Sequence, residues 1–156
     1  MAARTYRLGA ARRLINHVVR VLLRLGLGPR STYLLTVQGR KTGTLYSTPV
    51  TLVEDRGERW LVAPYGEVAW VKNARVAGTV TLRRGGRAEE VKIVELGPEA
   101  SAPVLKRYVA RAPITRPFFD ATPASDLEAF ATEAPRHPVF HIFAGGARSS
   151  PPRPVA

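Results

Sequence analysis

The residues best suited to chemistry in this chain form a short basic segment between two glycines, Gly39-Arg40-Lys41-Thr42-Gly43. Arg40 can bind a phosphate or carboxylate through two parallel hydrogen bonds, while Lys41 adds a point charge and Thr42 a hydroxyl. Glycine lets the backbone approach an anion closely. A solvated β-turn has a similar composition, so the segment predicts either an anion site or a plain turn. The spacing of a P-loop is absent.

A second segment, residues 63–70, joins the end of a predicted strand to a predicted helix and contains Tyr65 and Trp70. The start of a helix exposes backbone N–H groups to a ligand, and the two aromatic rings could contact a planar ring system. A tryptophan in a small domain is also typical of the core. The sequence therefore leaves two alternatives for Trp70, a wall of a binding site or a core residue.

Other kinds of catalytic site find little support. His137 and His141 are four residues apart, but in a predicted strand that spacing separates them by roughly 13 Å, so we expect no metal site. Ser31, Ser47 and Ser101 lack the context of a nucleophile elbow. The chain has no cysteine, which excludes thiolate chemistry and disulfides. We therefore expect an anion-binding domain whose chemistry comes from a bound organic molecule.

Short strands and a few helices must position these residues. Most connections are too short for parallel crossovers, which favours a small antiparallel barrel with helices outside it, an α+β fold that is mainly β. Thr122 is the expected cap of the last helix. The patterns predict strands at 33–37, 48–54, 59–63, 79–83, 88–96 and 139–143, and helices at 10–25, 68–77, 98–111 and 123–134.

The predicted first helix is amphipathic and basic. Nine of the 24 lysines and arginines precede the first acidic residue, Glu54, in a chain of net charge +12. One face is apolar and the opposite face is basic, the apolar members being Ala11, Leu14, Ile15, Val18, Leu22 and Leu25 and the polar members Arg13, His17, Arg20 and Arg24. Such a helix either packs on the barrel or lies on an anionic membrane surface. Nucleic acid is not the expected partner.

These observations divide the chain into three parts: a basic helix at 1–30, a cofactor-binding barrel at 31–143 and a disordered tail at 144–156 that is rich in Gly, Ser, Pro and Arg. Arginines interrupt the apolar stretch 14–27, so neither a secretory signal nor a transmembrane helix is expected. We expect a cytoplasmic monomer or homodimer, with peripheral attachment to the inner face of the membrane as the alternative location.

Several motifs occur together in a characteristic order. Residues 33–43 are followed by Ser47-Thr48-Pro49-Val50, then by the Leu61-Val62-Ala63 strand and by Trp70-Val71-Lys72-Asn73-Ala74-Arg75. Over roughly residues 8 to 143 the chain resembles the deazaflavin-dependent nitroreductase family. This resemblance implies a split β-barrel of the flavin-reductase or FMN-binding kind, with coenzyme F420 as the cofactor and FMN as the alternative.

The resemblance also implies roles for individual residues. The phosphate and acidic tail of the coenzyme would lie on Arg40, Lys41, Thr42 and Gly43, and its ring would lie beside Ser47, Pro49, Ala63, Tyr65, Gly66 and Trp70. Two departures from the family stand out. Tyr46 occupies a position that is often basic, and Pro64-Tyr65-Gly66-Glu67 replaces a common Ser-Lys-Gly-Gly.

The function implied is an F420H2-dependent oxidoreductase, in which hydride passes from the reduced deazaflavin to a small electron-poor substrate such as a quinone, enone or unsaturated lipid. Tyr65 is the expected catalytic residue, as a proton or hydrogen-bond donor. Phe118 and Phe119 are expected to wall the substrate, with ordinary packing as the alternative. A non-catalytic carrier of F420, FMN or haem is the alternative function.

Overall fold

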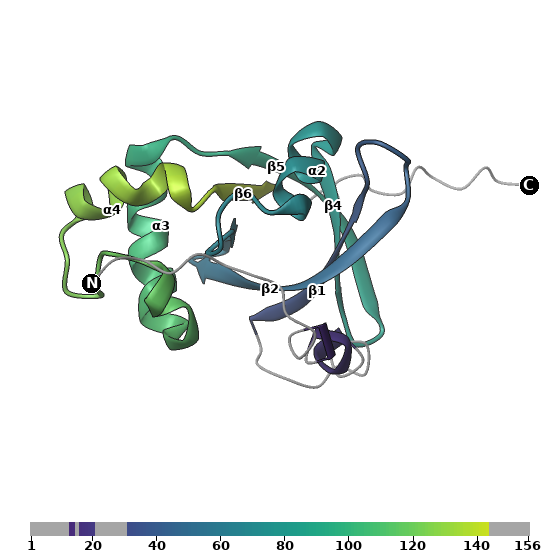
Figure 1. Ribbon diagram of the computed structural model, residues 1–156, viewed down its shortest axis with the longest axis horizontal. Helices are drawn as coiled ribbons and strands as arrows, with labels where there is room; N and C mark the ends of the chain where they lie inside the picture. The colour runs from purple at the N-terminus through teal and green to yellow at the C-terminus, as the bar shows by residue number, and fades with distance from the viewer. Residues whose placement is uncertain (1–12, 15, 21–30, 144–156) are drawn as a thin grey trace, which may run out of the picture.

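Six antiparallel strands close into a barrel in the computed structural model, which describes residues 13–14, 16–20 and 31–143 (Figure 1). Their order around the barrel is β1-β2-β3-β6-β5-β4, and every neighbouring pair is antiparallel. The split-barrel fold expected from the sequence is confirmed. The strands are β1 (Thr32–Gln38), β2 (Leu45–Asp55), β3 (Glu58–Val62), β4 (Thr79–Arg84), β5 (Arg87–Glu95) and β6 (Val139–Phe143).

Two tight hairpins set the register of the strands. Between β2 and β3, Arg56 and Gly57 both have positive φ, 51° and 81°, which is the backbone of a type I′ turn. Between β4 and β5, Gly85 has φ 61°. Alternate residues of the paired strands then point into the barrel, where Leu35, Leu52 and other apolar side chains form a buried core.

The helices cover the barrel at two places (Figure 1). Helix α2 (Ala69–Ala77) packs against β1 and β4, whereas α3 (Pro98–Arg111) and α4 (Leu127–Glu133) pack together beside β2, β3 and β6. Short 3₁₀ turns, η1 (Pro113–Phe118) and η2 (Ala134–Arg136), follow α3 and α4. A second apolar core lies between the barrel and these helices, and includes Val53, Val62, Leu105, Val109 and Phe130.

Helix α4 begins later than predicted. Thr122 does not cap it, because the Thr122 N–H donates to the Ser125 hydroxyl at 2.9 Å and closes a turn of its own. Asp126 is the cap instead, with its carboxylate accepting from the Ala129 N–H at 2.9 Å. The predicted start of the helix at residue 123 was therefore wrong, and the helix begins at Leu127.

Part of the predicted first helix is described. Residues 13–14 and 16–20 are helical, and they lie near β1 and β2 (Figure 1); the other residues of the predicted helix and the predicted disordered tail lie outside the described residues. Two members of its apolar face are exposed, Leu14 by 65% and Val18 by 47%. Among the described residues, no helix is long and apolar enough to cross a membrane.

Candidate functional site

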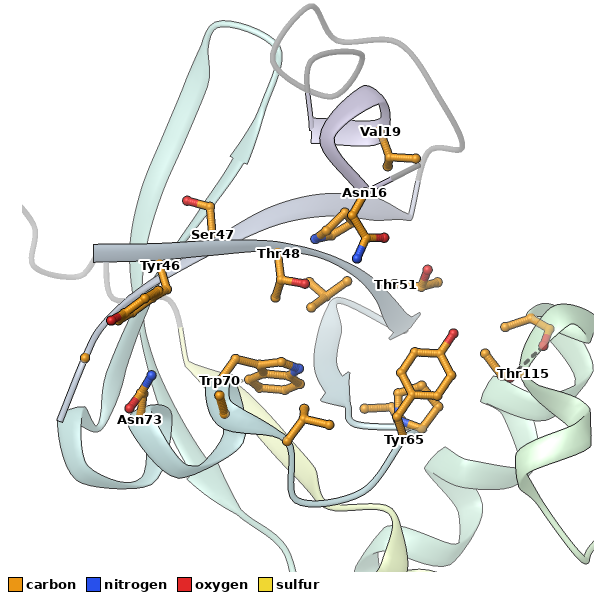
Figure 2. Close-up of a pocket in the computed structure, with 18 of the residues that line it drawn as sticks. Asn16, Val19, Tyr46, Ser47, Thr48, Thr51, Tyr65, Trp70, Asn73 and Thr115 are labelled. Atoms are coloured by element: carbon orange, nitrogen blue, oxygen red, sulfur yellow. Dashed lines mark hydrogen bonds between the residues drawn. The ribbon is translucent and has the colours of Figure 1, made fainter. Parts of the chain in front are cut away.

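A cavity of about 790 Å³ opens between the first helix, β2, α2 and the end of α3 (Figure 2). Its wall is contributed by segments far apart in the sequence, including the turn after β1, the loop after β3 and the residues around η1. Figure 2 shows Tyr46 and Asn73 toward one end and Thr115 at the other, with Trp70 and Tyr65 between them. The cavity therefore extends from the residues around Asn73 to those around Thr115.

One end is the basic turn predicted from the sequence. Arg40, Lys41 and Thr42 line the cavity there, and Gly43 has φ 76°, a conformation that glycine adopts at little cost. The turn is fixed to α2 by Asn73, a side chain that is only 4% exposed. The Asn73 amide oxygen accepts from the Arg40 backbone N–H at 3.1 Å and from Arg40 Nη1 at 2.8 Å.

The charges of this turn are available to a ligand. Arg59, Arg75, Arg107 and Arg136 each form an ion pair with a carboxylate. No carboxylate of the described residues lies within ion-pair distance of Arg40 or Lys41, and both side chains are exposed. This donor set suits a phosphate or a carboxylate.

Tyr46 closes the same end with an aromatic ring, at a position where the resemblance implied a basic residue. The ring packs so tightly on Gly39 that a Cβ at that position would lie 2.7 Å from Tyr46 Cε2. Tyr46 is nevertheless 52% exposed and lines the cavity. Gly39 is therefore needed for the packing of Tyr46, in addition to any role in approaching an anion.

Trp70, Ser47 and Pro49 also line the cavity, and Figure 2 shows Trp70 between its two ends. Trp70 is half-buried, and its ring lies 6.0 Å from the ring of the core residue Phe140. The two alternatives for Trp70 are thus combined, because one part of the side chain packs on the core and another part faces the cavity. The Ser47 hydroxyl lies 2.8 Å from the Thr36 hydroxyl, which fixes its rotamer beside the cavity.

The other end carries hydroxyl groups that sequence reasoning mostly missed. Tyr65, Tyr108 and Thr115 all line it. Burial raises the pKa of the Tyr108 hydroxyl, and the nearby Tyr65 hydroxyl raises it further. Tyr108 lies on the buried face of α3, and its side chain is 3% exposed. The Thr115 hydroxyl donates to the Ala112 carbonyl oxygen at 2.7 Å.

The remaining predicted site residues lie behind the cavity wall. Gly66 has φ 90° and shapes the loop after β3, where Ala63 is buried. Phe118 packs edge-on against Tyr65, with ring centroids 4.8 Å apart. Phe119 is buried and stacks on His137 at 3.9 Å. Tyr65 lines the cavity, and the two phenylalanines pack behind it.

The two histidines contact different residues. His141 lies in β6 and contacts Glu58 at 2.6 Å. His137 was expected in the same strand, but it follows η2 and precedes β6, where it contacts Glu133 and the Pro64 carbonyl oxygen. Among the residues that the structure describes, no group of three or more metal-ligating side chains is found.

Comparison with known proteins gives a consistent result. A family model described as F420H(2)-dependent quinone reductase matches residues 9–117. Among solved structures, the F420-H2 dependent reductase FDR-A is 23% identical, with a TM-score of 0.51 over 73% of this chain and 95% of its own. A domain-swapped dimer is 20% identical, with a TM-score of 0.53 over 86% and 100%. A conserved hypothetical protein from Mycobacterium tuberculosis is 15% identical, with a TM-score of 0.53 over 92% and 85%. The curated proteins give no match.

The link between Asn73 and the basic turn generates a prediction. Asn73→Ala removes the acceptor for the Arg40 backbone N–H, so we expect the free energy of unfolding to fall by about 1–3 kcal/mol, the cost of a lost part-buried hydrogen bond. Lys72→Ala, at an exposed position of the same helix, is the matched control and should change it by less than about 0.5 kcal/mol. Urea unfolding measures both, and equal effects would contradict a special role for Asn73.

Proposed function

The chain belongs to the F420H2-dependent quinone reductase family, with F420 as its cofactor, and from this we propose that it reduces a lipophilic, electron-poor substrate such as a quinone inside the cavity. The observation that carries the proposal is the division of this cavity. One end has cations that form no ion pair with a carboxylate of the described residues, and the other end has tyrosine hydroxyls. The first end suits the anionic tail of a coenzyme and the second suits an oxygen atom that gains a proton.

The residues present fit the cofactor. F420 carries a phosphate and glutamate carboxylates, and Arg40 and Lys41 provide cationic donors that no carboxylate of the described residues neutralises. Its ring is planar and needs flat apolar surface, which Trp70 and Pro49 supply beside the hydroxyl of Ser47. We propose that these residues bind the coenzyme, with Thr42 and Gly43 completing the turn.

Reduced F420 supplies two electrons and one proton as a hydride. Reduction of a quinone or enone needs a second proton on oxygen, and we propose that the Tyr65 hydroxyl donates this proton or a hydrogen bond that stabilises the developing charge. The Tyr108 hydroxyl stays protonated because burial raises its pKa, so it can serve as a second donor. Phe118 keeps the Tyr65 ring in place from behind.

The proposed binding of the tail can be tested at the basic turn. Arg40→Ala/Lys41→Ala should weaken F420 binding by on the order of 2–4 kcal/mol through the loss of charge-assisted contacts. Stability should change little, since exposed charges contribute little to it. Arg87→Ala/Lys92→Ala removes the same charge at exposed positions of β5 and is the control. Fluorescence titration measures affinity, and an unchanged dissociation constant in the first variant would sink the assignment.

The proposed role of Tyr65 predicts a split between turnover and binding. Tyr65→Phe removes the hydroxyl and keeps the ring, so kcat should fall by about 10²-fold, within the usual range for general acid catalysis. The affinity for F420 should stay within about threefold of wild type. Tyr46→Phe removes a hydroxyl from the other end of the cavity and should leave kcat nearly unchanged. Steady-state kinetics with a soluble quinone measures this, and wild-type turnover in Tyr65→Phe would reduce Tyr65 to a packing residue.

A side-by-side titration with F420 and FMN tests the alternative cofactor. FMN has a phosphate but lacks the acidic tail, so we expect F420 to bind more tightly. Absorbance of the purified protein and turnover with quinones separate a reductase from a carrier of F420, FMN or haem.

We also propose that the protein works at an anionic membrane surface, where lipophilic quinones are found. Exposed apolar side chains lie near the cavity: Leu14 and Val18 are on the helix whose Asn16 and Val19 line it, and Ile114, which is 82% exposed, also lines it. Arg13 and Arg20 on the same helix can contact anionic head groups, each contributing about 1 kcal/mol. These features support peripheral attachment of residues 1–30, the basic helix.

Vesicle binding tests this location. Leu14→Ser/Val18→Ser should lower affinity for anionic vesicles by about 2 kcal/mol or more, since less apolar surface leaves water, while F420 binding remains. Val76→Ser replaces an apolar side chain of α2 that is 71% exposed, and is the control. Co-sedimentation at low salt measures binding. If the unmodified protein ignores anionic vesicles, or if the double variant unfolds, the helix belongs to the barrel.

A further inference from the structure

Behind Tyr65 lies a buried pair of titratable side chains, Glu133 and His137, which are 2% and 3% exposed. His137 Nε2 lies 3.0 Å from Glu133 Oε1, and His137 Nδ1 lies 2.8 Å from the Pro64 carbonyl oxygen. The ring of Phe119 stacks on the imidazole with an interplanar angle of 18°. The pair is separated from the cavity by the loop that carries Pro64 and Tyr65.

The contacts of this pair fix its number of protons. A carbonyl oxygen only accepts, so His137 Nδ1 donates to Pro64. Glu133 already accepts backbone N–H groups on both oxygens, from Asp120 at 2.7 Å and Ala121 at 2.9 Å. The contact between Nε2 and Oε1 therefore needs one further proton, carried by the ring or by the carboxyl group. In both arrangements the net charge of the pair is zero.

Burial lowers the pKa of the His137 imidazole below its ordinary value, although the hydrogen bonds to Glu133 and Pro64 act in the opposite direction. Arg136 lies 3.6 Å from Glu133 Oε1 and is itself paired with Asp120 at 2.8 Å. Tyr108 faces the pair from α3 through the ring of Phe119, and it stays neutral. Loss of the shared proton would leave a net negative charge on the buried pair, which is unfavourable in a site of low polarity.

The pair is connected to Tyr65 by two routes. The first is direct, because His137 binds the carbonyl of Pro64, the residue that precedes Tyr65. The same loop is fixed to the His137 segment at one neighbouring point, where the Ala63 N–H donates to the Pro138 carbonyl oxygen at 2.8 Å.

The second route passes through the segment after η1. Glu133 binds the N–H groups of Asp120 and Ala121, and this fixes the chain that follows Phe118. The Phe118 ring packs edge-on against Tyr65, with an interplanar angle of 79°. One carboxylate and one imidazole thus restrain the Tyr65 backbone from one side and its ring from another.

We propose that Glu133 and His137 are positioning residues for the reaction, which keep the loop of residues 63–66 in the arrangement that presents Tyr65 to the cavity. The proposal rests on the proposed role of Tyr65. The contact from His137 Nδ1 to the Pro64 carbonyl oxygen is the one that acts on this loop directly.

Two substitutions at position 137 separate the contacts. The amide nitrogen of asparagine can take the place of imidazole Nδ1, so His137→Asn retains the donor to Pro64 and loses the contact with Glu133. The amide nitrogen of glutamine can take the place of Nε2, so His137→Gln retains the contact with Glu133 and loses the one with Pro64. Both variants are uncharged and leave a polar amide in the same site, which makes them controls for each other.

The first measurement is hydrogen exchange of the protein without coenzyme. The N–H groups of Gly66 and Val68 form hydrogen bonds inside the loop. We expect them to exchange at least tenfold faster in His137→Gln than in His137→Asn, at a temperature where both are folded by circular dichroism. Equal exchange in the two folded variants would overturn the proposal. If one variant fails to fold, the other is compared with wild-type protein: His137→Asn should match wild type at Gly66 and Val68, whereas His137→Gln should exchange at least tenfold faster than wild type, and the opposite result for either would overturn the proposal.

The second measurement is steady-state kinetics with F420H2 and a soluble quinone. His137→Gln should lower kcat at least tenfold with KM and the F420 dissociation constant within threefold of wild type, and this loss of kcat should be at least fivefold larger than the loss in His137→Asn. A parallel loss of coenzyme affinity would overturn the positioning role. If Tyr65→Phe turns over normally while His137→Gln still accelerates exchange at Gly66, the proposed function of Tyr65 fails and the restraint of the loop stands.

Discussion

Closure of the barrel is the constraint on which the rest of the structure depends. Pairing of β1 with both β2 and β4, and of β3 with β6, brings the turn after β1 and the loop after β3 to one cavity. The apolar residues inside the barrel stabilise this arrangement, as Leu35, Leu52 and Leu61 are fully buried. Because the strands are paired on both edges, the ends of these loops are fixed, and only their inner residues need further restraint.

That further restraint comes from buried polar side chains rather than from apolar packing. Asn73 accepts two hydrogen bonds from Arg40. His137 binds the Pro64 carbonyl oxygen beside Tyr65, and Glu133 binds the N–H groups of Asp120 and Ala121. A buried polar group is costly unless it is satisfied, so each of these side chains favours one loop conformation over its alternatives. Apolar contacts alone are less directional and would fix the loops less strictly.

Much of the fold could be predicted from local sequence patterns, but the buried polar side chains that restrain the loops could not. The apolar patterns of the short strands and the short connections between them report on neighbouring residues, so they predicted six strands in an antiparallel barrel, although β2 begins at Leu45 and not at residue 48. The cap of α4 was misplaced because Ser125 competes for Thr122. Asn73 contacts a residue 33 positions away, and His137 contacts one 73 positions away. Side chains of this kind look ordinary in sequence, since their partners are set only by the closed barrel. The basic turn, Tyr65 and Trp70 could be proposed because their residue types and their resemblance to a family were visible directly.

The two ends of the cavity place opposite demands on their surroundings. Arg40 and Lys41 must stay exposed, because a buried unpaired cation would be unstable, and exposure also lets them bind a charged coenzyme that arrives from water. A hydroxyl that serves a reaction gains from burial, since a donor in a site of low polarity interacts more strongly with developing charge. Tyr108 is buried and Tyr65 half-buried, in line with this demand. The exposed end then depends on α2 for its geometry and the buried end on α4 and η2, so the proposed coenzyme contacts and the proposed donor rest on separate parts of the fold.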